Sequence, residues 1–160
     1  MTATIRICMI GAGRVGKLHS GTLKRHVPGG DVVALVDPWE QVRNATGDEF
    51  GIERRFASLA DALDAVEFDA VVITTPTPTH RELAVLAAEH GKHVFLEKPM
   101  ALSLAECDDI LAAVDRHGVL LQMGFMRRFD PDFAAAWERI RGGEIGEPMM
   151  IKSLTHGPGL

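Results

Sequence analysis

Three glycines follow directly on a run of apolar residues near the start of the chain. The run Ile5–Ile10 passes without a polar turn into Gly11, Gly13 and Gly16, which have the spacing G-x-G-x-x-G. Glycine at these positions permits a tight turn, a close approach of another group to the backbone, and close packing of the following helix. The N–H groups that begin such a helix attract phosphate. The spacing is typical of a phosphate-binding turn, although a tight turn alone also uses glycine.

An acidic residue at the end of the next apolar run adds to this pattern. Asp37 closes the run "DVVALVD" and stands 21 residues beyond Gly16, near the ~20 residues expected in a dinucleotide-binding unit. Its carboxylate can accept hydrogen bonds from the ribose hydroxyls of NAD and would repel the additional phosphate of NADP. Pro38 and Trp39 follow, with no Arg or Lys placed to hold that phosphate. We predict a site that prefers NAD to NADP, the alternative being a solvated carboxylate at a strand end. The cofactor-binding residues predicted in this part of the chain are Gly11, Gly13, Arg14, Val15, Gly16 and Asp37.

Short apolar runs alternate with amphipathic stretches along the chain, and the alternation predicts the elements that position these residues. Strands are expected at residues 5–10, 31–37, 55–57, 69–75, 92–97 and 119–125. Helices are expected at residues 14–27, 39–49, from 58 onward, 79–90, 103–117 and 132–141. Ser103 and Glu106 form a capping box, and Asp130 with Pro131 starts the last helix. The segment 142–148 is a linker, and "MMIKSLT" is one further strand.

Several of these strands are continuous apolar runs, which is typical of strands buried on both faces of a parallel sheet. Every gap between them has room for a helical crossover, which parallel strands require. The sequence therefore predicts an α/β fold, an open, doubly wound parallel sheet of about six strands. We expect residues 1–145 to form this dinucleotide-binding Rossmann domain. Residues 146–160 are expected to be a linker and the first strand of a further domain.

Composition limits the remaining functions. The 160 residues fit one domain, and a net charge of −5 without a basic block argues against nucleic-acid binding. The first apolar run is too short for a secretion signal or a membrane span. Cys8 and Cys107 lack metal-ligand spacing, so we expect no metal site but buried free thiols in a reducing compartment. These features predict a cytoplasmic protein.

Three further motifs give the sequence a family resemblance. They are "TTPTPTH" (residues 74–80), "LEKPMALS" (96–103) and "GFMRRFDP" (124–131), and each stands at the end of an expected strand. Together with "GAGRVGKLHS", they resemble the glucose-fructose oxidoreductase and inositol dehydrogenase family (Gfo/Idh/MocA). The last motif is similar to inositol 2-dehydrogenases in particular. The resemblance covers about residues 5–155.

The resemblance implies an NAD(P)-dependent oxidation of a sugar or polyol hydroxyl. By the family pattern, Thr75 and Pro76 line the nicotinamide side of the cofactor, and Glu97 lies near the nicotinamide ribose. Lys98 reaches the substrate hydroxyl that loses its proton. A lysine has an ordinary pKa of ~10.4, so acting as a base requires desolvation or a nearby cation. Otherwise Lys98 orients the hydroxyl.

Two histidines have competing interpretations. His80 can touch the cofactor, but a histidine in the first turn of a helix more often serves local structure. His19, inside the first expected helix, is expected to pack against the sheet.

The motif after the sixth expected strand also has two interpretations. The resemblance implies that Met126 and Arg127 flank the cofactor and the substrate. Arg127 and Arg128 can equally form a structural ion pair with Asp130 or Asp132.

Members of this family carry a second, larger α/β domain that supplies an Asp and a His to the active site. The sequence ends as that domain would begin, and we expect the isolated chain to lack normal turnover. Two hypotheses follow. The chain is the cofactor-binding domain of an NAD-dependent polyol or sugar dehydrogenase, a homo-oligomer in its full-length form. Alternatively, it is a stand-alone NAD-binding module that senses the cofactor or docks a partner.

Overall fold

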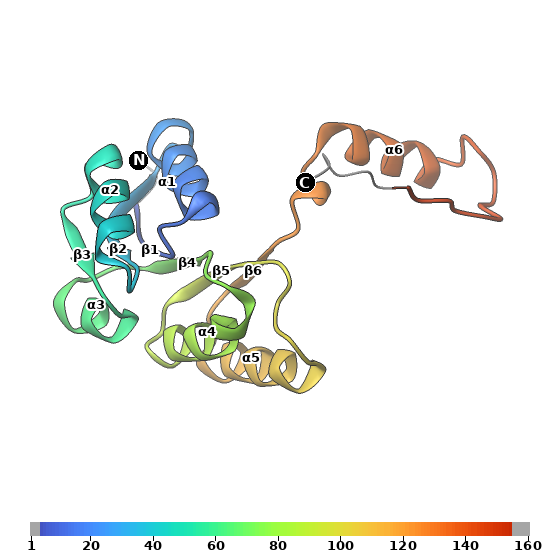
Figure 1. Ribbon diagram of the computed structural model, residues 1–160. Helices are drawn as coiled ribbons and strands as arrows, with labels where there is room; N and C mark the ends of the chain where they lie inside the picture. The colour runs from blue at the N-terminus through green and yellow to red at the C-terminus, as the bar shows by residue number, and fades with distance from the viewer. Residues whose placement is uncertain (1–3, 155–160) are drawn as a thin grey trace. The chain divides into compact units, whose positions relative to one another are not determined.

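A computed structural model describes residues 4–154 (Figure 1). The chain divides into two compact units, of which the first ends at Gly124 and the second begins at Phe125. The sheet and its helices lie in the first unit. The sequence placed the end of the Rossmann domain near residue 145, whereas the unit that holds the sheet ends about 20 residues earlier.

The first unit is built on a six-stranded parallel sheet. Its strands are β1 (Ile5–Ile10), β2 (Gly30–Val36), β3 (Arg54–Phe56), β4 (Ala70–Ile73), β5 (His93–Glu97) and β6 (Leu121–Gly124). The strand order is β3-β2-β1-β4-β5-β6, and every neighbouring pair is parallel. The chain therefore winds outward from β1 in one direction, then returns to β4 and winds in the other. This confirms the doubly wound sheet that the continuous apolar runs predicted.

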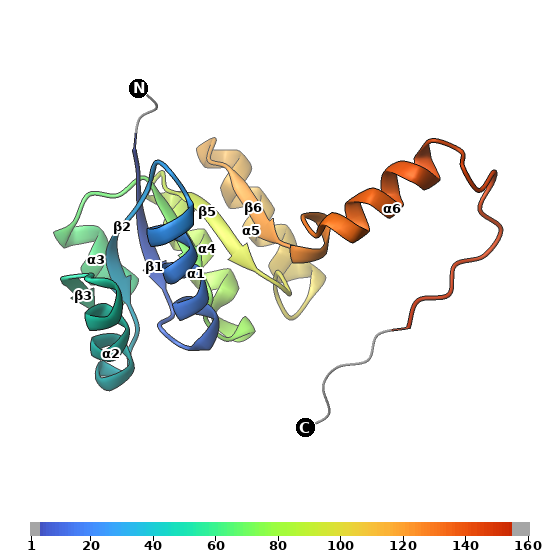
Figure 2. The ribbon, with the colours of Figure 1, turned by 90° about the horizontal axis from the view of Figure 1, so that it is seen from above.

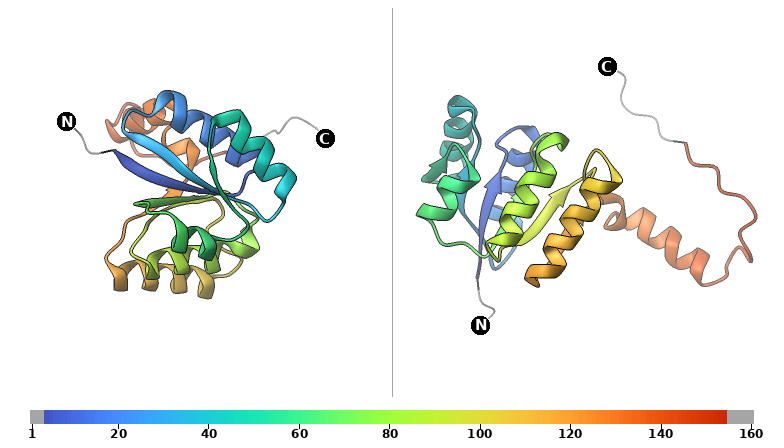
Figure 3. Two further views of the ribbon diagram at one scale, coloured as in Figure 1. Left: turned by 90° about the vertical axis from the view of Figure 1, so that its left-hand side faces the viewer. Right: turned by 90° about the horizontal axis from the view of Figure 1, so that it is seen from below.

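Helices cover both faces of this sheet (Figure 2). They are α1 (Arg14–His26), α2 (Glu40–Phe50), α3 (Leu59–Ala65), α4 (His80–Glu89) and α5 (Leu104–His117), with a short 3₁₀ turn η1 (Thr77–Thr79) before α4. Helices α1 and α2 lie on one face, and α3, α4 and α5 lie on the other (Figure 3, left). Within residues 4–154, none of the helices has the length and apolar character needed to cross a membrane.

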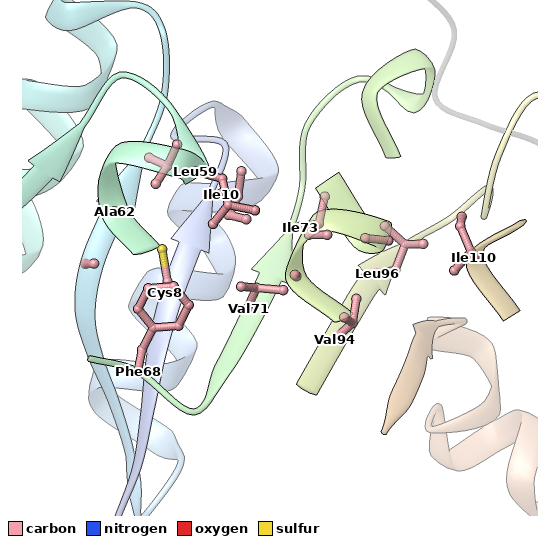
Figure 4. Close-up of a cluster of buried hydrophobic side chains, with 14 residues drawn as sticks. Cys8, Ile10, Leu59, Ala62, Phe68, Val71, Ile73, Val94, Leu96 and Ile110 are labelled. Carbon is pink, nitrogen blue, oxygen red and sulfur yellow. The ribbon is translucent and has the colours of Figure 1, made fainter. Parts of the chain in front are cut away.

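The two larger hydrophobic clusters hold these layers together, one on each side of the sheet. Successive side chains of a strand point to opposite faces, so β1 contributes to both. Cys8 and Ile10 join the cluster with side chains of α3, α4 and α5 (Figure 4). Ile7 and Met9 join the cluster that packs against residues of α1 and α2. A strand that must bury both faces explains why the sequence shows continuous apolar runs.

The helix ends follow the capping residues of the sequence. Ser103 Oγ accepts a hydrogen bond from Glu106 N at 3.3 Å, and Ser58 caps α3 in the same way. The Glu106 carboxylate accepts from Leu102 N at 2.8 Å, one residue before the partner in a standard capping box. Gly118, with φ +63°, ends α5.

The second unit contains the 3₁₀ turn η2 (Met126–Arg128) and helix α6 (Pro131–Arg141). Asp130 caps α6 by accepting from the N–H groups of Asp132 and Phe133, as the Asp-Pro pair predicted. The strand expected in "MMIKSLT" does not form over residues 149–154, and Thr155 lies outside the described residues. A strand needs a neighbouring strand for its backbone hydrogen bonds, and residues 149–154 pair with none in the described part of the chain.

The two cysteines differ in their environments. Cys8 is fully buried in the centre of the sheet, and this burial raises the pKa of its thiol to about 12. Cys107 on α5 is only half-buried, contrary to the expectation that both thiols are buried. Both are free cysteines.

The buried thiol predicts a loss of stability in alkali. Between pH 9 and about 12 the unfolded chain ionises Cys8 while the folded chain keeps it neutral. The free energy of unfolding should therefore fall by about 1.4 kcal/mol per pH unit in this range from this group alone. Urea denaturation between pH 8 and 11 measures it. In the Cys8→Ala variant, the free energy of unfolding should fall less steeply with pH than in the unaltered chain. The matched control, Cys107→Ala, should keep the slope of the unaltered chain. Equal slopes in the unaltered chain and both variants would contradict the prediction.

Candidate cofactor site

The glycine-rich turn joins β1 to α1, and its three glycines differ in conformation and surroundings. Gly11 has φ +97°, a conformation that side chains disfavour. A Cβ at Gly16 would lie 1.8 Å from the carbonyl oxygen of Gly11, so α1 could not approach the strand. A Cβ at Gly13 would meet nothing within 4 Å. The fold itself requires Gly11 and Gly16, whereas Gly13 faces open space.

Three side chains from other elements hold this turn. Asp37 Oδ2, at the end of β2, accepts from Ala12 N at 2.8 Å. Thr46 Oγ1, buried on α2, donates to Ala12 O at 2.9 Å. Thr74 Oγ1, after β4, donates to Gly11 O at 3.0 Å. The backbone amides of the turn are thus fixed before a ligand arrives, which reduces the cost of binding. Sequence reasoning gave neither threonine a role, because no spacing rule links them to the glycines.

Asp37 keeps capacity for a ligand as well as holding the turn. Its other oxygen, Oδ1, accepts from Trp39 N at 2.9 Å. Each carboxylate oxygen has two lone pairs, so one on each oxygen is left for ligand hydroxyls. From α2, Arg43 Nη1 donates to the Asp37 carbonyl oxygen at 2.5 Å. The cation Arg43 therefore lies beside the end of β2, although the residues directly after Asp37, Pro38 and Trp39, gave no sign of it.

A cavity of about 820 Å³ opens where these elements meet, at the carboxyl ends of the central strands. This is the edge where open α/β sheets bind ligands. Of the residues predicted from the sequence, those that line it are Gly11, Gly13, Arg14, Val15, Asp37, Thr75 and Pro76. Leu83 and Leu86 of α4 also line it, and so does Trp39, which has 74% of its surface exposed. The cavity combines the glycine-rich turn, a carboxylate and apolar surface suited to a flat ring.

Glu97 and Lys98 follow β5 at the same edge of the sheet. Glu97 Oε1 lies 2.9 Å from His19 Nε2, and Oε2 accepts from Lys98 N at 3.1 Å. The His19 ring also packs edge-on against Phe95, with centroids 5.4 Å apart. A Cβ at Gly124 would lie 3.1 Å from Glu97 Cδ, so that glycine makes room for the carboxylate. His19 packs against the sheet as expected, and its contact with Glu97 was not predicted.

Lys98 itself is exposed. The first unit therefore leaves this side chain open to solvent at the edge of the sheet.

His80 lies beneath the loop after β4 rather than in the cavity wall. It is 1% exposed, and its ring nitrogens face two backbone carbonyls, Pro99 O at 2.8 Å from Nδ1 and Thr75 O at 2.9 Å from Nε2. Neither nitrogen is left free for a ligand. This geometry favours the structural interpretation of His80 over a direct contact with the cofactor.

Met126 and Arg127 belong to η2 in the second unit. The Arg127 guanidinium lies over the Phe133 ring, 4.9 Å from its centre, which is a cation–π contact. Within residues 125–154, neither Arg127 nor Arg128 forms an ion pair with Asp130 or Asp132. The roles of Met126 and Arg127 at the cofactor stay predictions.

Comparison with known proteins agrees with this site. The Gfo/Idh/MocA family model, described as "Oxidoreductase family, NAD-binding Rossmann fold", matches residues 5–125. The chain belongs to this family. The part matched by the family model contains the glycine-rich turn, Asp37 and the Glu97–Lys98 pair.

Relatives in the Gfo/Idh/MocA family include inositol dehydrogenases. The chain is 41% identical over 159 residues to scyllo-inositol 2-dehydrogenase (NAD(+)) of Bacillus subtilis, covering 99% of this chain and 46% of the relative. It is 32% identical to myo-inositol 2-dehydrogenase of Thermotoga maritima, covering 96% and 46%. Scyllo-inositol dehydrogenase from Lactobacillus casei, solved with NAD(H) and scyllo-inositol, superposes with a TM-score of 0.86 at 30% identity, covering 90% and 43%. The chain thus spans about half the length of the relatives it matches.

The different environments of Gly13 and Gly16 predict that an added methyl group lowers stability at Gly16 but lowers ligand affinity at Gly13. Gly16→Ala forces a backbone clash and should cost about 3 kcal/mol of stability or prevent folding. Gly13→Ala should leave the melting temperature within a few degrees of the unaltered chain, since its Cβ meets nothing, yet weaken NADH binding at least tenfold. Thermal denaturation and calorimetric titration measure the two effects. A Gly13→Ala chain that binds NADH normally would contradict the assignment of Gly13 to the ligand.

Proposed function

We propose that this chain is the cofactor-binding part of an NAD-dependent oxidoreductase that transfers a hydride between the nicotinamide and a hydroxyl-bearing carbon of inositol or a related polyol or sugar. The observation that carries the proposal is the Asp37 carboxylate, which fixes the glycine-rich turn and also faces the cavity. The inositol dehydrogenases among the relatives support the substrate class.

The residues of the first unit fit the parts of a dinucleotide in order along the sheet edge. The turn amides and the start of α1 would hold the pyrophosphate, because they present N–H groups beside Gly13, where space is open. Asp37 would accept hydrogen bonds from the adenosine ribose. Thr75 and Pro76 would line the nicotinamide side, and Glu97, held by His19, would lie near the nicotinamide ribose. Bound NAD supplies the carbon that accepts the hydride.

Lys98 would act on the substrate hydroxyl. A carbon that gives up a hydride leaves a hydroxyl that must lose its proton, and a positioned amine takes the proton or holds the hydroxyl for another base. Glu97 fixes the backbone N–H of Lys98, so the start of this segment is anchored to the sheet. Met126 and Arg127 of the second unit would flank the cofactor and substrate.

The sensor or docking module is the less favoured hypothesis. A module that only binds NAD has no need of a lysine at the substrate position, and the relatives are named as dehydrogenases. Homo-oligomerisation and a cytoplasmic location remain predictions.

The Asp37 assignment predicts a change in cofactor preference. Asp37→Asn removes the charge that repels the NADP phosphate but keeps an oxygen for Ala12 N. It should narrow the ratio of NAD⁺ to NADP⁺ affinity about tenfold, equivalent to about 1.4 kcal/mol. Calorimetric titration with both cofactors measures the ratio. Glu53→Gln, the same charge change at an exposed residue outside the cavity lining, should leave the ratio unchanged. Equal affinities of the unaltered chain for both cofactors would refute the preference.

The Lys98 assignment predicts a loss of rate without a loss of cofactor. In the complete protein, Lys98→Ala should lower kcat for inositol oxidation by about 10²–10⁴-fold and leave the Kd for NAD⁺ within twofold. Steady-state kinetics with scyllo- and myo-inositol and a separate NAD⁺ titration test this. Lys92→Ala, at an ion-paired lysine before β5, is the matched control and should preserve kcat. If NAD⁺ affinity fell in proportion to kcat, Lys98 would have to be assigned to cofactor binding instead.

A further inference from the structure

We infer that His80 is a positioning residue that sets the nicotinamide loop after β4 against the Lys98–Pro99 segment after β5. The inference rests on the proposed function, because it takes Thr75 and Pro76 as the nicotinamide side. It begins from a buried polar ring whose two nitrogens both meet backbone carbonyls of other segments.

The two carbonyls belong to the two loops that the reaction must bring together. Thr75 O follows β4, and Pro99 O follows Lys98 at the end of β5. These strands are parallel neighbours, so their carboxyl ends lie side by side but the loops beyond them share no strand hydrogen bonds. The imidazole ring supplies the missing connection.

The ring is a spacer of fixed width. A carbonyl oxygen only accepts hydrogen bonds, so a neutral ring donates to one of the two and a protonated ring to both. In either form the planar ring, 1% exposed, separates the loops by its own dimensions and resists their approach. Moving the loop whose carbonyl accepts from a ring N–H therefore leaves a buried donor without a partner, unless the ring and the other loop move with it.

The loop after β4 is held by hydrogen bonds within itself, so the His80 ring positions the whole loop as one rigid unit. Thr79 Oγ1 donates to Pro76 O at 2.9 Å and lies 2.7 Å from Thr75 Oγ1. The glycine-rich turn is held by bonds from Thr46 and Thr74, and Asp37 is held by the N–H groups of Ala12 and Trp39, so none of these bonds involves His80. His80 should consequently govern the nicotinamide half of the site and leave the adenosine half unchanged.

Paired titrations of this chain with NADH and ADP-ribose test the inference, since ADP-ribose lacks only the nicotinamide ring. His80→Ala should lower the ratio of NADH to ADP-ribose affinity at least tenfold while ADP-ribose binds within twofold of the unaltered chain. The two conservative variants divide the ring's contacts. His80→Gln places its amide near the position of Nε2 and keeps the contact to Thr75 O, whereas His80→Asn keeps the contact to Pro99 O. Because Thr75 lies on the proposed nicotinamide side, His80→Gln should retain more of the ratio of NADH to ADP-ribose affinity than His80→Asn.

His90→Gln is the matched control, since that exposed ring near the end of α4 contacts one carbonyl, Leu86 O, at 2.8 Å. It should leave the ratio unchanged. If His80→Ala does not fold, the Gln and Asn variants decide the question. Equal weakening of both ligands, or no change in the ratio in any His80 variant, would overturn the inference alone. An unaltered chain that binds neither ligand would instead overturn the proposed function and the inference with it.

Discussion

The hydrogen bond from Ala12 N to the Asp37 carboxylate, 2.8 Å long and buried, joins the ends of β1 and β2 at the point where the ligand cavity opens. A carboxylate withdrawn from water is costly unless N–H groups replace the water. Here the backbone of Ala12 and Trp39 supplies them. The same group that stabilises the turn also carries the negative charge that we propose distinguishes NAD from NADP. In that proposal, folding of the turn and recognition of the cofactor depend on one side chain.

The strand order explains why these groups meet. The chain winds outward from β1 through β2, then returns to β4 on the other side of β1, so the loops after β1 and β4 diverge over the cavity. Close packing of α1 at Gly16 keeps the start of that helix at the cavity edge. Thr74 bonds the turn from the β4 side, opposite to Asp37 and Thr46. The glycine-rich turn is therefore held from both halves of the sheet.

The sequence was sufficient where chemistry follows from local spacing. The glycines, Asp37 and the apolar runs predicted the turn, its carboxylate and the doubly wound sheet, because each depends on a recurrent interval in the sequence or on burial of both strand faces. It was insufficient for Thr46 and for the His19–Glu97 contact, which join residues 34 and 78 positions apart with no fixed interval. Arg43 lies only 6 residues beyond Asp37, but no spacing rule links a helix side chain to that carbonyl. The strand predicted at the end of the chain failed over residues 149–154 for a related reason, because apolar β-formers become a strand only beside a partner.

The two parts of the candidate site, the glycine-rich turn with Asp37 and the segment with Lys98, differ in how firmly the structure holds them. The turn and Asp37 are fixed by buried bonds, whereas Lys98 stands exposed at the end of β5. Buried partners hold the first part in place, whereas the side chain of Lys98 is not covered by the residues of the first unit. In the proposed reaction, the cofactor would therefore enter a site whose turn is already fixed, whereas the side chain proposed to act on the substrate stands open to solvent.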